Sequence, residues 1–94
     1  MEAAMKKTII TVLGKDRVGI IAKTSMYLAD NGVNILDLTQ TILDDYFNMV
    51  MIVDISGSGK SFAELSDGLD QVGAELGVQI KMQQDDIFEA MHRI

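Results

Sequence analysis

The sequence contains no cysteine, no proline and no tryptophan, and it has a single histidine, His92. Without cysteine there are no disulfides, thiolate zinc sites, iron–sulfur clusters or cysteine nucleophiles. No apolar run approaches the roughly 20 residues that span a bilayer, and no signal-peptide pattern follows Met1. We therefore predict a soluble cytoplasmic protein that carries no metal and no cofactor and binds no membrane.

Aromatic residues and positive charges are also scarce. There are two tyrosines and three phenylalanines, and the formal charge is −6. An acidic chain repels the phosphate backbone of nucleic acids, and five aromatic side chains offer few surfaces on which bases could stack. We therefore expect no nucleic-acid partner. The 94 residues suffice for one domain, 1–94, and a domain this small has a thin margin of stability that pairing with a second chain would improve.

The first half of the chain alternates strand and helix patterns. Residues 6–13 are rich in β-branched side chains and predict a strand closed by Gly14. Residues 18–31 predict a helix that ends at Asn31-Gly32. Its predicted apolar set is Val18, Ile21, Ala22, Leu28 and Ala29. Residues 34–43 and 47–55 predict a hairpin joined at Asp44-Asp45, with Leu36, Leu38 and Ile42 on one face of its first strand.

The second half repeats this order. Ser61 and Glu64 fit a capping box that opens a helix ending at Gly77. Its predicted apolar stripe consists of Phe62, Leu65, Leu69, Val72 and Leu76. Val78, Ile80 and Met82 then alternate with polar residues in a last strand. Asp85 can cap a short terminal helix bearing Ile87, Phe88, Met91 and Ile94.

The predicted fold is therefore α+β and ferredoxin-like, βαββαβ, with a short C-terminal helix. Right-handed crossovers give an antiparallel sheet in the order 4-1-3-2 with two helices on one face. This topology puts the loop 14–19 and the Asp44-Asp45 hairpin at one end of the sheet, and Asn34 with the loop 56–60 at the other. The edge strand 34–43 carries only Asp37 as a charge against edge pairing, so we expect a homodimer that covers it.

Several residue groups could carry chemistry but have simpler explanations. Gly59-Lys60-Ser61 resembles the end of a phosphate-binding loop, although Asp54 stands where its first glycine would be and Ser61 is explained as a helix cap. Asp44-Asp45 and Asp85-Asp86 fit turn and capping chemistry better than a cation site. His92 near the chain end complements a helix dipole.

Arg17 and Asn48 are similar to the arginine and asparagine of acylphosphatases, which share this fold. The loop GKDRVG lacks the glycine-rich phosphate cradle of those enzymes, and Asp16 beside Arg17 opposes a bound phosphate. The simpler interpretation is that Arg17 is solvated or paired with an aspartate and that Asn48 lies on the polar face of its strand.

The loop from Gly14 to Gly19 has a different character. It carries one carboxylate and two cations, and Gly19 opens a helix whose first amides are unpaired. An α-amino acid would suit it, because its carboxylate matches the amides with Lys15 or Arg17 and its ammonium matches Asp16. A solvated turn between strand and helix remains the alternative.

A family resemblance bears on this choice. Gly14-x-Asp16-Arg17-x-Gly19-Ile20-Ile21-Ala22, followed by Asn31-Gly32-Val33-Asn34-Ile35, resembles the signature of ACT domains, small regulatory modules of amino-acid metabolism. The match covers nearly the whole chain. Residues 87–94 are further similar to the ending of free-standing single-ACT-domain proteins, related to the modules of the glycine-cleavage repressor and formyltetrahydrofolate deformylase.

The resemblance implies a site and a function. ACT effectors bind at a dimer interface, between the first strand–helix loop of one chain and the Asn-Ile segment of the other. Carried over, the ligand-binding residues are Gly14, Lys15, Asp16, Arg17, Gly19, Ile20, Asn34 and Ile35. We therefore predict a dimeric regulatory domain, not an enzyme, that binds a small metabolite such as an amino acid and acts on a partner protein. A ligand-free dimeric adaptor is the alternative, and an acylphosphatase-like hydrolase is the third possibility.

Overall fold

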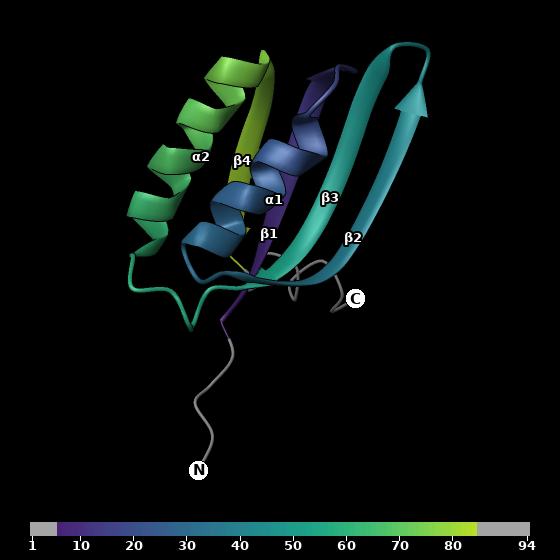
Figure 1. Ribbon diagram of the computed structural model, residues 1–94. Coiled ribbons are helices and arrows are strands. Elements are labelled where there is room, and N and C mark those ends of the chain that lie inside the picture. The colour runs from purple at the N-terminus through teal and green to yellow at the C-terminus, as the bar shows by residue number, and fades with distance from the viewer. Residues whose placement is uncertain (1–5, 85–94) are drawn as a thin grey trace.

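Six elements alternate in the order strand, helix, strand, strand, helix, strand. The computed structural model describes residues 6–84, in the order β1 (Lys7–Lys15), α1 (Ile20–Asp30), β2 (Asn34–Leu43), β3 (Tyr46–Asp54), α2 (Phe62–Leu76) and β4 (Val78–Gln84). The strands form one antiparallel sheet in the order β2-β3-β1-β4, and both helices cover one of its faces (Figure 1). The predicted ferredoxin-like fold is confirmed. The predicted terminal helix, with Phe88, Met91 and His92, lies outside the described residues.

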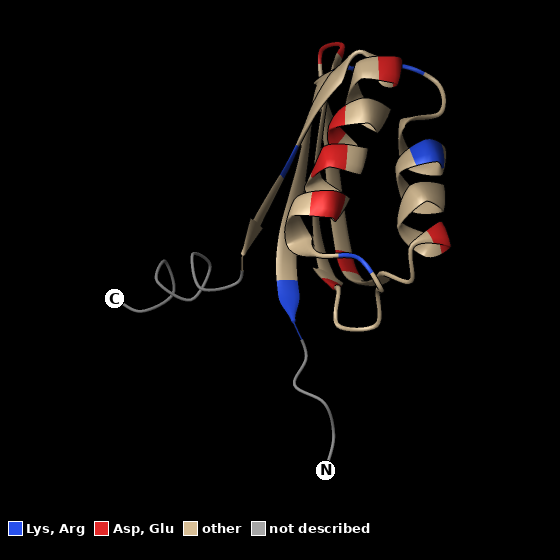
Figure 2. Cartoon of the chain, turned by 90° about the vertical axis from the view of Figure 1, so that its left-hand side faces the viewer, with Lys and Arg blue, Asp and Glu red and all other residues tan. Residues whose placement is uncertain are grey.

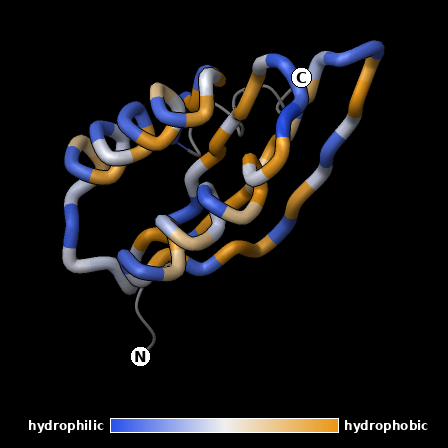
Figure 3. The backbone as a smooth tube through the Cα atoms, turned by 45° about the horizontal axis from the view of Figure 1, so that its top comes forward, coloured by the Kyte–Doolittle hydropathy of each residue, from blue (hydrophilic) through white to orange (hydrophobic). Residues whose placement is uncertain are grey.

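The core lies between the sheet and the two helices. Alternate residues of the central strands point toward the helices and are buried. The two helices each carry both hydrophobic and hydrophilic residues along their turns (Figure 3). The buried apolar strand residues are Ile10, Val12, Phe47, Met49, Met51, Val53, Val78 and Ile80. Leu65, Leu69 and Leu76 of α2 close the layer from above. Each fully buried large side chain contributes about 1.5–3 kcal/mol, so this layer is the main source of stability.

Both ends of α2 follow the predicted local signals. The Ser61 hydroxyl accepts a hydrogen bond from the Glu64 amide at 3.2 Å, and the Glu64 carboxylate accepts one from the Ser61 amide at 2.8 Å. Gly77 ends the helix with a left-handed backbone, φ 74°. The capping box and the glycine C-cap are therefore confirmed.

The buried face of α1 differs from the prediction. The helix begins at Ile20, and its buried residues are Ile20, Thr24 and Leu28, one turn apart. Val18 precedes the helix with 97% of its surface exposed, and Ile21, Ala22 and Ala29 are exposed as well. Of the predicted apolar set, only Leu28 is buried. A threonine occupies the central core position, which hides the true repeat of the buried face.

Two strand details also differ. β1 continues through Gly14 to Lys15, and Gly14 pairs with Phe47 of β3 and Val78 of β4. An added Cβ at Gly14 would lie 2.7 Å from Cγ1 of Val78, so this glycine is required by packing within the sheet and does not end the strand. In β2 a register shift between Ile35 and Asp37 leaves Leu36 out of the predicted alternation.

The edge strand β2 is largely uncovered. It lies beside β3, beyond the cover of both helices (Figure 1), and nine of its ten residues are exposed. Its apolar side chains Leu36, Leu38, Ile42 and Leu43 therefore reach the surface. Among residues 6–84, β2 has a free backbone edge next to exposed apolar side chains.

Candidate functional site

The loop between β1 and α1 ends in an uncapped helix start. Gly19 is the N-cap residue with φ 95°, a left-handed backbone that favours glycine. No side chain caps it, and the first turn of α1 has no acidic residue. The first main-chain bond across the cap is from the Lys23 amide to the Gly19 carbonyl, 2.9 Å. The amides before Lys23 thus present the positive end of the helix dipole toward the loop.

A pocket of about 230 Å³ lies beside this helix start. Four of the predicted site residues line it, namely Asp16, Arg17, Gly19 and Ile20. The sequence analysis missed the rest of its lining, which consists of Ile21, Ala22, Gln40, Ile42 and Phe47. Because Ile42 pairs with Phe47 across the hairpin, the register of the hairpin was the signal that could have identified this wall.

Arg17 is bound to the far end of α2. Its Nη1 donates a hydrogen bond to the Leu76 carbonyl at 2.9 Å, across 59 residues of sequence. The last turn of α2 contains no basic residue, so the Arg17 guanidinium supplies the cation that complements the negative end of this helix. Arg17 is exposed, as the expectation of a solvated arginine requires, but the sequence analysis did not predict its bond to the Leu76 carbonyl.

The β2–β3 hairpin supports the same loop. The Asp16 amide donates a hydrogen bond to the Asp45 carbonyl at 2.7 Å. This bond uses the backbone of Asp16 and not its carboxylate. Lys15 Nζ lies 3.7 Å from Asp45 Oδ2, with both side chains about 70% exposed (71% and 68%), and an ion pair this exposed adds little stability. Neither Lys15 nor Gly14 lines the pocket. These two predicted site residues are therefore not part of its lining.

Asn34 and Ile35 lie at the opposite end of the sheet. Asn34 pairs with Asp54 and Ile35 with Val53, whereas the pocket lies near the hairpin turn. Asn34 is exposed and Ile35 half-buried. Within one chain the two halves of the predicted site are thus apart, as the predicted topology requires.

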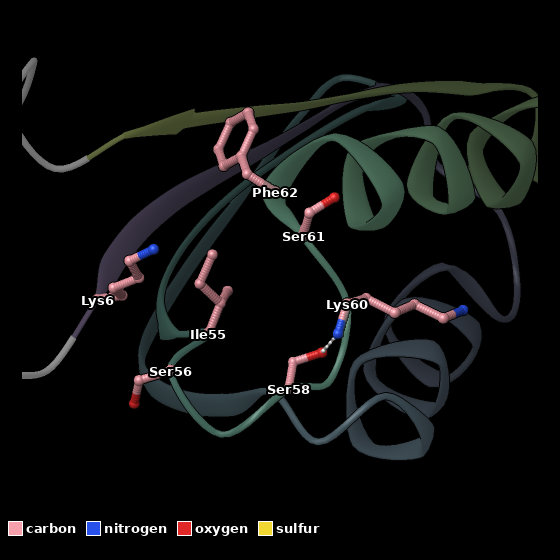
Figure 4. Close-up of a pocket in the computed structure, with 7 residues that line it drawn as sticks. All are labelled: Lys6, Ile55, Ser56, Ser58, Lys60, Ser61 and Phe62. Atoms are coloured by element: carbon pink, nitrogen blue, oxygen red, sulfur yellow. Dashed lines mark hydrogen bonds between the residues drawn. The ribbon is translucent and has the colours of Figure 1, made fainter. Parts of the chain in front are cut away.

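A second pocket, of about 380 Å³, lies at the Asn34 end and includes the loop that resembles a phosphate-binding motif (Figure 4). The Lys60 amide donates to the Ser58 hydroxyl at 3.1 Å, while the Lys60 side chain extends away from Lys6 (Figure 4). The Ser61 hydroxyl is already used in the capping box. This geometry supports the interpretation of the segment as loop and cap.

Asp54 fixes the start of that loop. Its Oδ1 accepts hydrogen bonds from the Ser56 and Lys6 amides, both at 3.0 Å. Hydrogen bonds from Ser56 are the main cause that lowers the pKa of the Asp54 carboxyl, and the bond from the Lys6 amide lowers it further. A stable carboxylate at this point disfavours a bound phosphate, in line with the sequence argument.

The acylphosphatase-like pair is not brought together. Asn48 pairs with Leu13 and is exposed between the buried residues Phe47 and Met49, so it lies on the sheet face away from the helices. Arg17 instead contacts the end of α2, in the helix layer. The two side chains therefore lie on opposite sides of the sheet.

Metal and membrane features were searched within residues 6–84. No group of three or more histidine, aspartate or glutamate side chains there could hold a metal ion. No helix in the same range is long and apolar enough to cross a bilayer. His92 and Asp85-Asp86 lie outside the described residues.

Comparison with known proteins identifies relatives along most of the chain. A family model described as "ACT domain" matches residues 6–83. A UPF0237 protein of Bifidobacterium longum is 50% identical over 90 residues, covering 96% of this chain and 100% of the relative. The family model ends at residue 83, whereas the match to this relative covers 90 residues of the chain and so includes residues beyond 83.

Solved structures agree with this match. An ACT domain protein from Streptococcus pneumoniae has a TM-score of 0.80 and 42% identity, covering 92% of this chain and 97% of that one. A protein described as a glycine cleavage system transcriptional repressor (TM-score 0.75, 22% identity, covering 87% of this chain and 47% of that one) shares the fold. A formyltetrahydrofolate deformylase from Pseudomonas syringae also shares the fold, with a TM-score of 0.80 and 18% identity, covering 87% of this chain and 28% of that one.

Proposed function

Because this chain belongs to the ACT domain family, we propose that it is a regulatory module that binds an amino acid as a homodimer. In this proposal the bound state is passed to a partner protein. The observation that carries the proposal is the pocket beside α1, which combines the Asp16 carboxylate with the uncapped helix start at Gly19.

The pocket chemistry matches the backbone groups of an α-amino acid. The free amides at the start of α1 suit the ligand carboxylate, and Asp16 suits the ammonium. Ile21, Ile42 and Phe47 offer apolar surface to the ligand side chain. The volume of about 230 Å³ is below the range of about 300–1,000 Å³ that holds drug-sized ligands, which suits a small metabolite.

The proposed dimer forms through β2. Its free edge and exposed Leu38 and Ile42 are features that proteins normally cover. A two-fold axis at this edge makes the two β2 strands antiparallel, so the start of one lies against the end of the other. The partner subunit's Asn34 and the partner's Ile35 then approach the loop from Lys15 to Gly19. This arrangement would complete the site that one chain leaves divided.

A ligand-free dimeric adaptor is the second candidate, and one observation favours it. Arg17, a predicted cation for the ligand carboxylate, already donates to the Leu76 carbonyl. If that bond persists when a ligand binds, Lys15 and the α1 amides must hold the ligand carboxylate without help from Arg17. An adaptor would use the same β2 interface and leave the pocket empty.

Isothermal titration of the full chain with the twenty amino acids separates the two candidates. Saturable heat with at least one amino acid supports the regulatory module. Absence of heat with all twenty, from a protein that sediments as a dimer, would favour the adaptor. Competition among the amino acids that bind would then rank the side chains that Ile21, Ile42 and Phe47 accept.

A further inference from the structure

A groove lies between the two helices, on the outer surface of the helix layer. It has a volume of about 300 Å³ and is lined by Ala22, Lys23 and Met26 of α1 and by Val72 and Glu75 of α2. Met26 is 62% exposed, and Val72 is half-buried. Apolar side chains of both helices therefore reach an open surface in the described part of the chain.

The two helices contact each other one turn away from this groove. Tyr27 lies one turn beyond Lys23, and its hydroxyl donates a hydrogen bond to the Leu65 carbonyl at 3.4 Å. A Cβ at Gly68, one turn before Val72, would overlap the Tyr27 ring. This close contact fixes the helices relative to each other, so the groove is formed before any partner binds.

The helices around the groove are acidic. Together α1 and α2 carry one cation, Lys23, and five carboxylates, so their formal charge is −4. Figure 2 shows acidic positions recurring along α2. The carboxylates belong to Asp30, Glu64, Asp67, Asp70 and Glu75. The helix layer is therefore a negatively charged surface.

Four of these carboxylates lie near the groove. Glu75 lines it, and Asp30 lies in the turn of α1 that follows it. Burial raises the pKa of Tyr27, and the carboxylates of Asp67 and Glu64 raise it further, so both carboxylates lie near the contact between the helices. The apolar groove thus has negative charge around it.

This charge distinguishes among possible occupants of the groove. A second copy of the chain would bring two surfaces of charge −4 together, and nucleic acid or anionic lipid would be repelled in the same way. A cationic partner is attracted. Ala22 and Met26 are one turn apart, which matches the spacing of apolar anchors at i and i+4 on a third helix. An apolar centre with charged margins is also the usual anatomy of a protein interface.

We propose that the groove binds a cationic amphipathic helix of a partner protein. Apolar side chains of that helix pack against Met26 and Val72. Its lysine or arginine side chains lie near Glu75, Asp67 and Asp30.

This inference names the partner chemistry that the proposed function leaves open. It rests on action through a partner protein, which the regulatory module and the adaptor share, and not on amino-acid binding. Ala22 lines both this groove and the β1–α1 pocket. A partner helix in the groove and a ligand in the pocket would therefore contact the same turn of α1.

A designed peptide tests the proposal on the full chain. The probe has about 18 residues, enough to form a helix, with leucine at i, i+4 and i+7 spacing and lysine elsewhere. A matched peptide has glutamate in place of every lysine. Fluorescence anisotropy measures affinity, and methyl NMR locates the contact. We expect the lysine peptide to bind and to shift the Met26 and Val72 signals, while the signals of Val50, which is exposed on the other face of the sheet, stay in place.

Four outcomes would overturn the proposal. They are no binding of the lysine peptide, equal binding of both peptides, shifts at Val50 instead of Met26, and shifts of Met26 and Val72 with chain concentration alone, which would assign the groove to a second copy. Amino-acid titration is a separate measurement. A chain that binds an amino acid but not the peptide would therefore reject this inference and leave the proposed ligand site standing.

The apolar part of the contact is tested by one pair of variants. Met26→Ala should weaken binding of the lysine peptide by about fivefold or more, as for a side chain at the centre of an interface. Val50→Thr, on the opposite side of the sheet, is the control and should change the affinity by less than about twofold. Similar losses in the two variants would contradict the assigned position.

The charged part is tested by a second pair. Asp67→Asn combined with Glu75→Gln should weaken binding by about fivefold. Asp37→Asn combined with Asp44→Asn removes the same charge from β2 and the hairpin turn, and should weaken binding by less than about twofold. Equal effects of the two double variants would show general attraction to an acidic chain and would contradict the proposal.

Discussion

Arg17 Nη1 and the Leu76 carbonyl oxygen are 2.9 Å apart, which ties the β1–α1 loop to the end of α2. The same guanidinium borders the pocket beside Asp16. One side chain thus contacts both the proposed ligand site and the helix that precedes β4. Any ligand that draws Arg17 into the pocket would release the Leu76 carbonyl.

Replacing Arg17 with methionine keeps an unbranched, flexible side chain and removes this bond. We expect the free energy of unfolding to fall by about 1 kcal/mol, because a charge-assisted hydrogen bond is lost at a partly exposed position. Urea unfolding measures it. Lys15→Met is the control, and its exposed pair with Asp45 predicts a change within about 0.5 kcal/mol. Equal losses in the two variants would contradict the structural role of Arg17.

Asp16 is the residue on which the proposed binding of the ligand ammonium depends. Asp16→Ala should weaken the binding of any amino acid found by titration by about 1.5–3 kcal/mol, the usual contribution of a hydrogen bond to a charged group. Lys60→Ala should leave affinity unchanged, since its loop serves α2 at the other end of the sheet. Equal effects at both positions, or none at either, would place the site elsewhere.

Gly14 is expected to tolerate no side chain. An added Cβ would lie 2.7 Å from Val78 Cγ1 and 3.0 Å from Val78 Cα. Because the clash includes a backbone atom, a change in the Val78 rotamer cannot relieve it. Gly14→Ala should lower the free energy of unfolding by about 1–3 kcal/mol. Gly59→Ala is the matched control, with nothing within 4 Å of its added Cβ, and should be neutral or stabilise by up to about 1 kcal/mol. Thermal unfolding compares them.

Thr24 is fully buried in α1, and its Oγ1 lacks a hydrogen-bond partner among the described residues. Thr24→Val removes an unpaired hydroxyl and keeps the branched shape, so the protein should gain about 1 kcal/mol of stability. Thr24→Ser keeps the hydroxyl and removes a methyl group, and should lose about 1 kcal/mol. A loss in the valine variant as large as that in serine would show that the hydroxyl is satisfied.

Local signals explain why so much of the fold was predictable. Three of these signals each involve only a few neighbouring residues, so they can be recognised in the sequence. They are the capping box of Ser61 and Glu64, the C-cap at Gly77 and the turn at Asp44-Asp45. The buried face of α1 was missed because Thr24 interrupts the apolar repeat. The Arg17 bond spans 59 residues, and the pocket wall at Gln40 and Ile42 depends on hairpin register. Contacts between distant segments of this kind leave no periodic pattern.

The central claim is that a ligand bound at Asp16 is shared between two subunits. The most direct test is the dimer dissociation constant, measured by sedimentation equilibrium with and without a saturating amino acid. Linkage predicts that ligand tightens the dimer by about 5- to 150-fold, a coupling of about 1–3 kcal/mol. A dimer constant that does not change while titration demonstrates binding would confine the site to one subunit and contradict the account.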